Sequence, residues 1–217
     1  MAAKEQRAPV AKARTKPAAS VGVAEHGNSA VLITLDAGGA LLDRRKVDLT
    51  KGLPTHPYHH EGSWAVGRYV DSPWARKTTL PEAIALVERV RAAAAAGARA
   101  ALDALAAEVP VTIETIAIRV CPELPATTEE RIRDTRAATM ADSVMYREAL
   151  GTAAGARGWA VDWYDRESVA EDAAIALGGA DLDVFLRAMG RAAGPPWQAI
   201  HKLAAAAALA ARTKRGP

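Results

Sequence analysis

Residues 30–49 read AVLITLDAGGALLDRRKVDL, two runs with apolar residues on either side of a pair of glycines. The run from Ala30 to Asp36 is rich in residues that favour β-strands. Residues 41–49 place charged side chains between apolar ones. The sequence Ala37-Gly38-Gly39 separates the two runs and predicts a tight turn, because glycine adopts positive φ without steric cost. We therefore predict an antiparallel β-hairpin over residues 30–49.

The chain after the hairpin predicts alternating strands and helices. Proline and glycine predict a loop over residues 50–62, and SWAVGRYV (63–70) is predicted to form a third strand. Capping boxes at Thr79-x-x-Glu82 and Thr127-x-x-Glu130 predict helices. The remaining predicted elements are helices over 79–107 and 128–154, strands over 109–120 (VPVTIETIAIRV) and 159–164 (WAVDWY), and terminal helices broken at 178–179 and 194–196, the last over 197–212.

Length and composition indicate one domain. The chain has 217 residues, of which half are apolar, and this fits a single α/β domain rather than a disordered chain. Residues 1–28 show no periodicity, so we predict a disordered basic tail over 1–28, a domain over 29–212 and a second basic tail over 213–217. The net charge of +3 is concentrated in these tails, which either contact phosphates or are simply solvated.

Several function classes are excluded by what the sequence lacks. Cys121 is the single cysteine, which excludes an intrachain disulfide and a cysteine zinc cluster and fits a reducing compartment. No run of about 18 apolar residues occurs, so we expect no membrane span and a cytoplasmic protein. Neither a phosphate-binding Walker loop nor a Gly-x-Ser-x-Gly nucleophile elbow is present. The 52 alanines suggest a GC-rich bacterial genome.

The predicted order of elements resembles the ribonuclease H-like fold, and the middle of the chain resembles bacterial Holliday-junction resolvases. Those nucleases place an aspartate on the first strand, a glutamate in an Ile-Glu pair on the fourth, and acidic or histidine ligands on the last helix. Here Asp36 ends the first predicted strand, and Ile113-Glu114 lies on the fourth. His201-Lys-Leu-Ala204 stands where some members have His-x-x-Asp.

This resemblance implies a metal-dependent nuclease acting on DNA or RNA. Asp36 and Glu114 would bind Mg²⁺ or Mn²⁺, and His201 would orient the attacking water or complete the ligand set. Ala204 cannot hold a metal, and the family's Asp-Pro-Gly signature is missing. The alternative is therefore a catalytically silent ribonuclease H-like module that binds a protein or nucleic-acid partner, and a homo-oligomer is also open.

A second resemblance carries no function. The segments LDRR (42–45), LPTHPYH (53–59) and GPPW (194–197) are similar to those of a group of uncharacterised bacterial proteins.

Each candidate residue also has a structural explanation. Glu114 is predicted to be buried among isoleucines, which requires a metal, an arginine partner or a raised pKa. Asp36 is equally suited to forming the hairpin turn, and His201 to a surface or interface position. Asp162 and Asp165 would be substitutes for a missing acidic ligand, or would be solvated strand-end residues.

A second cluster lies in the predicted loop. His56, His59, His60 and Glu61 fall within six residues, and imidazole with carboxylate suits zinc. The alternative is a loop that packs its prolines and Tyr58 onto the hairpin.

Overall fold

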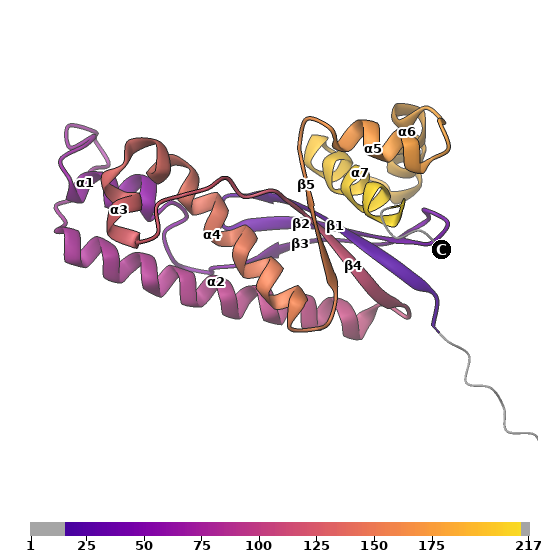
Figure 1. Cartoon of the computed structure of the whole chain (residues 1–217), viewed down its shortest axis with the longest axis horizontal. Helices are drawn as coiled ribbons and strands as arrows, with labels where there is room; N and C mark the ends of the chain where they lie inside the picture. Colours follow the sequence, from indigo (N-terminus) through magenta and orange to yellow (C-terminus); the bar gives the residue numbers. More distant parts are fainter. Residues whose placement is uncertain (1–15, 214–217) are drawn as a thin grey trace, which may run out of the picture.

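The computed structural model describes residues 16–213, so the parts of the predicted tails over 1–15 and 214–217 lie outside the described residues. Its centre is a sheet in the order β3-β2-β1-β4-β5 (Figure 1). The strands are β1 (Ala18–His26), β2 (Ser29–Asp36), β3 (Leu41–Asp48), β4 (Thr112–Arg119) and β5 (Ala160–Tyr164). The first three strands pair antiparallel, whereas β4 is parallel to β1 and β5 is parallel to β4. The strand order and directions are those that the resemblance to the ribonuclease H-like fold implies, and the predicted α/β class with a helical C-terminal region is confirmed.

Helices connect and cover the strands. They are η1 (Tyr58–Gly62), α1 (Ser63–Ala65), α2 (Leu80–Glu108), α3 (Thr128–Arg133), α4 (Thr135–Gly155), α5 (Val169–Ala176), α6 (Leu182–Ala193) and α7 (Ala199–Thr213). Among the described residues, no helix is both long enough and apolar enough to cross a membrane.

Both predicted capping boxes are confirmed. The Glu82 carboxylate accepts the backbone N–H of Thr79 at 2.7 Å at the start of α2, and Glu130 accepts that of Thr127 at 3.0 Å at the start of α3. The helix predicted over 128–154 is divided in two, because Asp134 has an extended backbone and its carboxylate caps α4 through Ala137. Local capping chemistry thus sets three of the helix starts.

The strand prediction contains one omission and one error. The hairpin over 30–49 is confirmed as β2 and β3, but β1 begins at Ala18, so residues 18–28 belong to the sheet and not to a tail. Residues 63–70 do not form a strand: α1 and turns replace it, and Gly67 and Tyr69 have φ of 79° and 57°. Left-handed backbone at these two positions is incompatible with a strand. Asp36 therefore ends the second strand, not the first.

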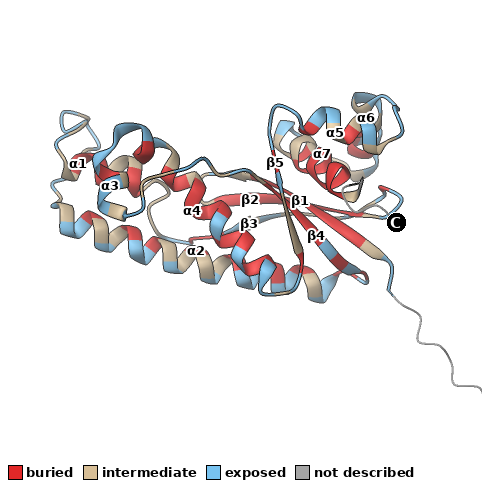
Figure 2. Ribbon diagram, in the orientation of Figure 1, coloured by how far each residue is buried: buried red, intermediate tan, exposed pale blue. Residues whose placement is uncertain are grey.

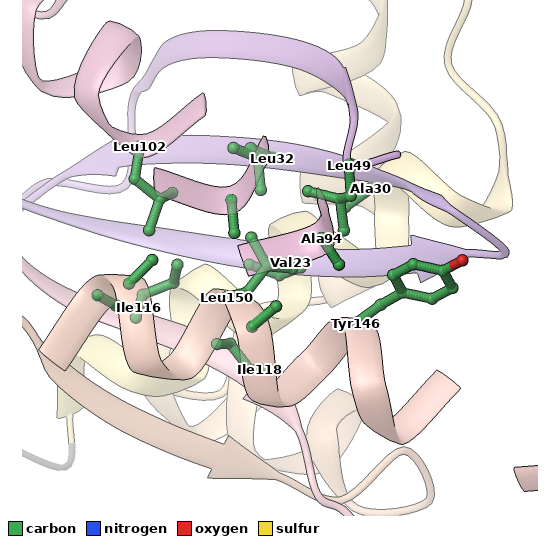
Figure 3. Close-up of a cluster of buried hydrophobic side chains, with 14 of the residues drawn as sticks. Val23, Ala30, Leu32, Leu49, Ala94, Leu102, Ile116, Ile118, Tyr146 and Leu150 are labelled. Atoms are coloured by element: carbon green, nitrogen blue, oxygen red, sulfur yellow. The ribbon is translucent and has the colours of Figure 1, made fainter. Parts of the chain in front are cut away.

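Helices cover both faces of the sheet. On one face, α2 and α4 enclose a core with β1, β2 and β4, part of which is shown in Figure 3. On the other face, α7 packs on β1, β2 and β4, with α5 and α6 around it. Figure 2 shows that β1 is buried along almost its whole length. The sheet is therefore the middle of three layers, as parallel strands require.

The alanine-rich run of α7 is explained by its close contact with β1. Gly22 lies directly beneath the backbone of Ala204 and Ala208, and a Cβ at residue 22 would overlap both. The Ser20 hydroxyl donates to the carbonyl of Ala208 at 2.8 Å. Small side chains on both elements are needed for a helix to lie this close to a strand. Ala204, considered above as a missing ligand, is thus a fully buried packing residue.

Candidate functional site

Asp36 forms the turn between β2 and β3. Its Oδ1 accepts the backbone N–H of Ala40 at 2.8 Å, and its own N–H donates to the Ala40 carbonyl at 3.0 Å. The carbonyl of Asp36 accepts the N–H of Gly39, whose φ of 88° favours glycine. The structure therefore gives Asp36 the turn-forming role that the sequence left open.

Glu114 lies near the amino end of β4 and is exposed. The prediction that it is buried among isoleucines is wrong, because residues 111–115 alternate between the two faces and Glu114 shares the exposed face with Thr112. Asp36 and Glu114 do line one small pocket of about 190 Å³. They meet there because β2 ends where β1 and β4 begin. Two of the three predicted site residues are thus brought together.

His201 is separated from this pair. It lies in the first turn of α7, where its Nδ1 accepts the N–H of Gln198 at 3.1 Å and its ring stacks on Trp197 at 5.8 Å between centroids. The pocket of Asp36 and Glu114 is reached only by Ala211 and Arg212 at the far end of the helix. Ten residues of helix correspond to about 15 Å. Burial, together with the charge of Arg44, lowers the pKa of His201, which suits its packing role.

The residues around Asp36 and Glu114 do not fit a divalent-metal centre. Mg²⁺ requires several oxygen ligands, but one oxygen of Asp36 is committed to the turn and Arg212 brings a positive charge into the same pocket. Within residues 16–213, no group of three His, Cys, Asp or Glu side chains is placed to hold a metal ion. The predicted metal ligands therefore share a pocket without forming a ligand set.

A larger concave site lies at the opposite, carboxyl edge of the parallel strands. The chain leaves β1 toward β2 on one side, and leaves β4 toward β5 on the other. Open α/β sheets bind ligands at such a switch point. Two pockets of about 500 and 490 Å³ adjoin here and share Arg119 and Arg166. We call them together the carboxyl-edge crevice.

Cations from three elements line this crevice. Arg119 ends β4, Arg166 follows β5, and Lys202 lies in the first turn of α7. Within the described part of the chain, none of the three makes an ion pair or a side-chain hydrogen bond. Sequence reasoning missed them, although two stand at or just beyond strand ends, which is a signal that could have found them.

Glu25 is the one carboxylate on β1, and it is neutralised within the fold. Arg147 of α4 donates through Nε to Glu25 Oε1 at 2.7 Å and through Nη1 to the Val120 carbonyl at 2.9 Å. The side chains of Arg147 and Glu25 are only 7% and 8% exposed. This buried pair joins the carboxyl ends of β1 and β4 to α4. The other carboxylates that line the crevice are Asp165, Glu167 and Asp183.

The histidine cluster surrounds a buried aspartate of α4. Asp142 accepts the backbone N–H of Tyr58 at 3.0 Å and that of His59 at 3.1 Å, and His56 Nδ1 lies 3.9 Å from Asp142 Oδ2. Tyr58 is fully buried in the core. This burial supports the packing role of the loop. Across the described part of the chain, no three His, Cys, Asp or Glu side chains are placed together to hold a metal ion.

Asp142 should make stability depend on pH. Burial raises the pKa of Asp142 to about 7, against the two N–H donors that lower it. A raised pKa in the folded state favours folding below the unfolded value near 4, and this contribution is lost as the pH rises through about 7. In the wild type, the free energy of unfolding should therefore fall by up to about 1.4 kcal/mol per pH unit between about pH 4 and 7, and Asp142→Asn should remove this fall.

Urea unfolding of both proteins at pH 5, 6, 7 and 8 measures this effect. The pKa of His56 and of His59 is lowered by burial, so these groups make stability rise with pH, opposite to the effect of Asp142. Parallel stability curves for the two proteins would show that Asp142 does not titrate in this range.

Comparison with known proteins gives a fold-level likeness. No protein-family model matches the chain, and no curated protein matches it. Among solved structures, RuvC from Thermus thermophilus in complex with a Holliday junction substrate is 14% identical, with coverage of 91% of this chain and 94% of that chain and a TM-score of 0.47. A second Thermus thermophilus RuvC structure is also 14% identical, with coverage of 91% and 95% and a TM-score of 0.43.

Proposed function

We propose that this chain is a ribonuclease H-like module that binds nucleic acid at the carboxyl-edge crevice without cutting it. The observation that carries the proposal is the convergence of Arg119, Arg166 and Lys202, none with an ionic partner in the described chain, on one concave site. Each cation without an ion-pair partner can bind a negatively charged group of a ligand, and does so here in a crevice that Asp165, Glu167 and Asp183 also line. Arginine also pairs with phosphate through two parallel hydrogen bonds.

The location of the carboxylates supports binding over hydrolysis. Glu25, the one acid of β1, is occupied by Arg147, and the pair Asp36 and Glu114 lies at the other edge of the sheet. A phosphodiester held by the crevice cations would therefore be remote from Asp36 and Glu114, and Asp165 of the crevice belongs to no group of three side chains placed to hold a metal ion within residues 16–213. A metal-dependent nuclease would have to act at the pocket of Asp36 and Glu114, where the turn role of Asp36 and the charge of Arg212 oppose metal binding.

Fluorescence anisotropy with labelled single-stranded DNA, duplex DNA, four-way-junction DNA and RNA tests the proposal. The variant Arg119→Gln/Arg166→Gln/Lys202→Gln is expected to bind at least one of these about 10- to 100-fold more weakly than wild type. The slope of log affinity against log salt should fall by about 3 for duplex DNA if all three side chains contact phosphate.

A control variant separates the crevice from net charge. Arg89→Gln/Arg99→Gln/Arg191→Gln removes the same charge from exposed positions outside the pockets. Its affinity should stay within about twofold of wild type at 150 mM salt, where the Debye length is about 8 Å. Equal losses in both triple variants, or no binding by the wild type, would overturn the proposal.

A further inference from the structure

The loop over residues 67–79, between α1 and α2, exposes two aromatic side chains. We call it the aromatic loop. Trp74 is 63% exposed and Tyr69 is 53% exposed, and Arg76 and Lys77, which follow Trp74, are exposed as well. Figure 1 shows this loop at the end of the molecule formed by α1 and α3. Neither the fold nor the crevice accounts for such exposure of large apolar surface.

The base of the aromatic loop is fixed, while its tip projects. Arg68 donates to the carbonyls of Ile132 and Arg133, the latter at 3.0 Å, and to Thr135 Oγ1 at 3.1 Å. Tyr69 then adopts a φ of 57°, which is uncommon for a side chain of its size, and its ring lies 5.9 Å from that of His59 between centroids. A non-glycine residue held in this conformation by its surroundings is typical of functional loops.

The base of the aromatic loop is bonded to the start of α4, a helix that also lines the carboxyl-edge crevice. Arg68 contacts Thr135 at the start of α4, and Thr139, one turn further, lines the crevice. Four residues of helix correspond to about 6 Å. A strand of nucleic acid that leaves the crevice toward the start of α4 would therefore run toward the base of the loop.

We infer that the aromatic loop stacks the bases of single-stranded nucleic acid that leaves the carboxyl-edge crevice; this inference rests on the proposed function. Aromatic faces bind bases without regard to sequence, and adjacent cations hold the backbone. The exposed charged side chains of residues 67–79 are Arg76, Lys77 and Asp71, so the loop presents a small excess of positive charge, which favours a polyanion. Duplex DNA, whose bases are stacked on one another, offers the loop no free base face.

The test measures binding of Trp74→Ala to single-stranded and duplex DNA of equal length. Affinity for the single strand should fall about 5- to 100-fold, the range for losing one stacked base, and affinity for the duplex should stay within about twofold. Trp74→Phe, which keeps an aromatic face, should recover most of the loss. Ile175→Ala, at a position that is 65% exposed, is the matched control for loss of exposed apolar surface and should bind as wild type does.

The outcomes separate this inference from the proposed function. If Trp74→Ala binds single strands as wild type does while the Arg119/Arg166/Lys202 variant binds much more weakly, the role of the loop is overturned and the role of the crevice is kept. Trp74 would then be a candidate contact for a protein partner. Equal losses for single strand and duplex also overturn base stacking. Absence of binding by the wild type overturns both proposals.

Discussion

Replacing Arg147 with methionine is expected to destabilise the protein by about 3–5 kcal/mol, because it leaves the Glu25 carboxylate buried without its partner. Arg147 contacts both Glu25 and the carbonyl of Val120, so the carboxyl ends of β1 and β4 lose a shared anchor on α4. Methionine keeps a long apolar stem in the same space. Urea unfolding, followed by circular dichroism, measures the change.

The double variant Glu25→Gln/Arg147→Met shows whether the pairing is the cause. Because it removes both charges, it should be more stable than Arg147→Met alone, with a coupling of about 1–3 kcal/mol in the double-mutant cycle. The exposed pair of Arg133 and Glu129 provides a matched control, and Arg133→Met should cost about 0.5 kcal/mol or less. Additive losses at Glu25 and Arg147 would contradict the account of Glu25 as an acid neutralised within the fold.

Gly22→Ala is expected to be the most disruptive single-methyl addition in the sheet. The added Cβ would overlap the Ala204 carbonyl and the backbone nitrogen of Ala208, and backbone atoms cannot rotate away as a side chain can. Overpacking typically costs 1–3 kcal/mol of stability. Because the added Cβ meets helix backbone, we expect Gly22→Ala to lower the free energy of unfolding by about 3 kcal/mol or more. The helix α7 would have to move away from β1, which would also disturb Lys202 at its first turn.

Gly155→Ala is the matched control. Gly155 ends α4, and a Cβ there meets no atom within 4 Å. Alanine should therefore raise stability, by up to about 1 kcal/mol, since it is the better helix former. A Gly22→Ala protein as stable as wild type would contradict the close contact between α7 and β1.

The fold was predictable because its signals are local. Three short segments each specify their own structure: the glycine turn at residues 37–39, the capping boxes at Thr79 and Thr127, and the β-branched run over 112–119. The first strand was missed because small residues and Gly22 weaken its β signal, and its burial depends on α7, which is distant in sequence. The wrongly predicted strand over 63–70 made up for the missing β1, so the number of strands was right. Asp36 was nevertheless assigned to the first strand and not to the second.

The site was less predictable because it depends on which ends of the strands meet. Asp36 and Glu114 were expected to lie together and do share a pocket, but with Arg212 and without His201. The cations of the crevice come from three elements, and their convergence follows from the parallel pairing of β1, β4 and β5. The alternation over 111–115 was the signal that Glu114 faces outward.

A cleavage assay tests most directly the claim that this fold binds nucleic acid without cutting it. Labelled single-stranded, duplex and four-way-junction DNA, and RNA, are incubated with Mg²⁺ or Mn²⁺ at a protein concentration that saturates the anisotropy signal, beside Glu114→Gln purified in the same way. We predict saturated binding and no cleavage by either protein. Cleavage by the wild type that Glu114→Gln abolishes would contradict this account and assign a metal-dependent nuclease to the pocket of Asp36 and Glu114.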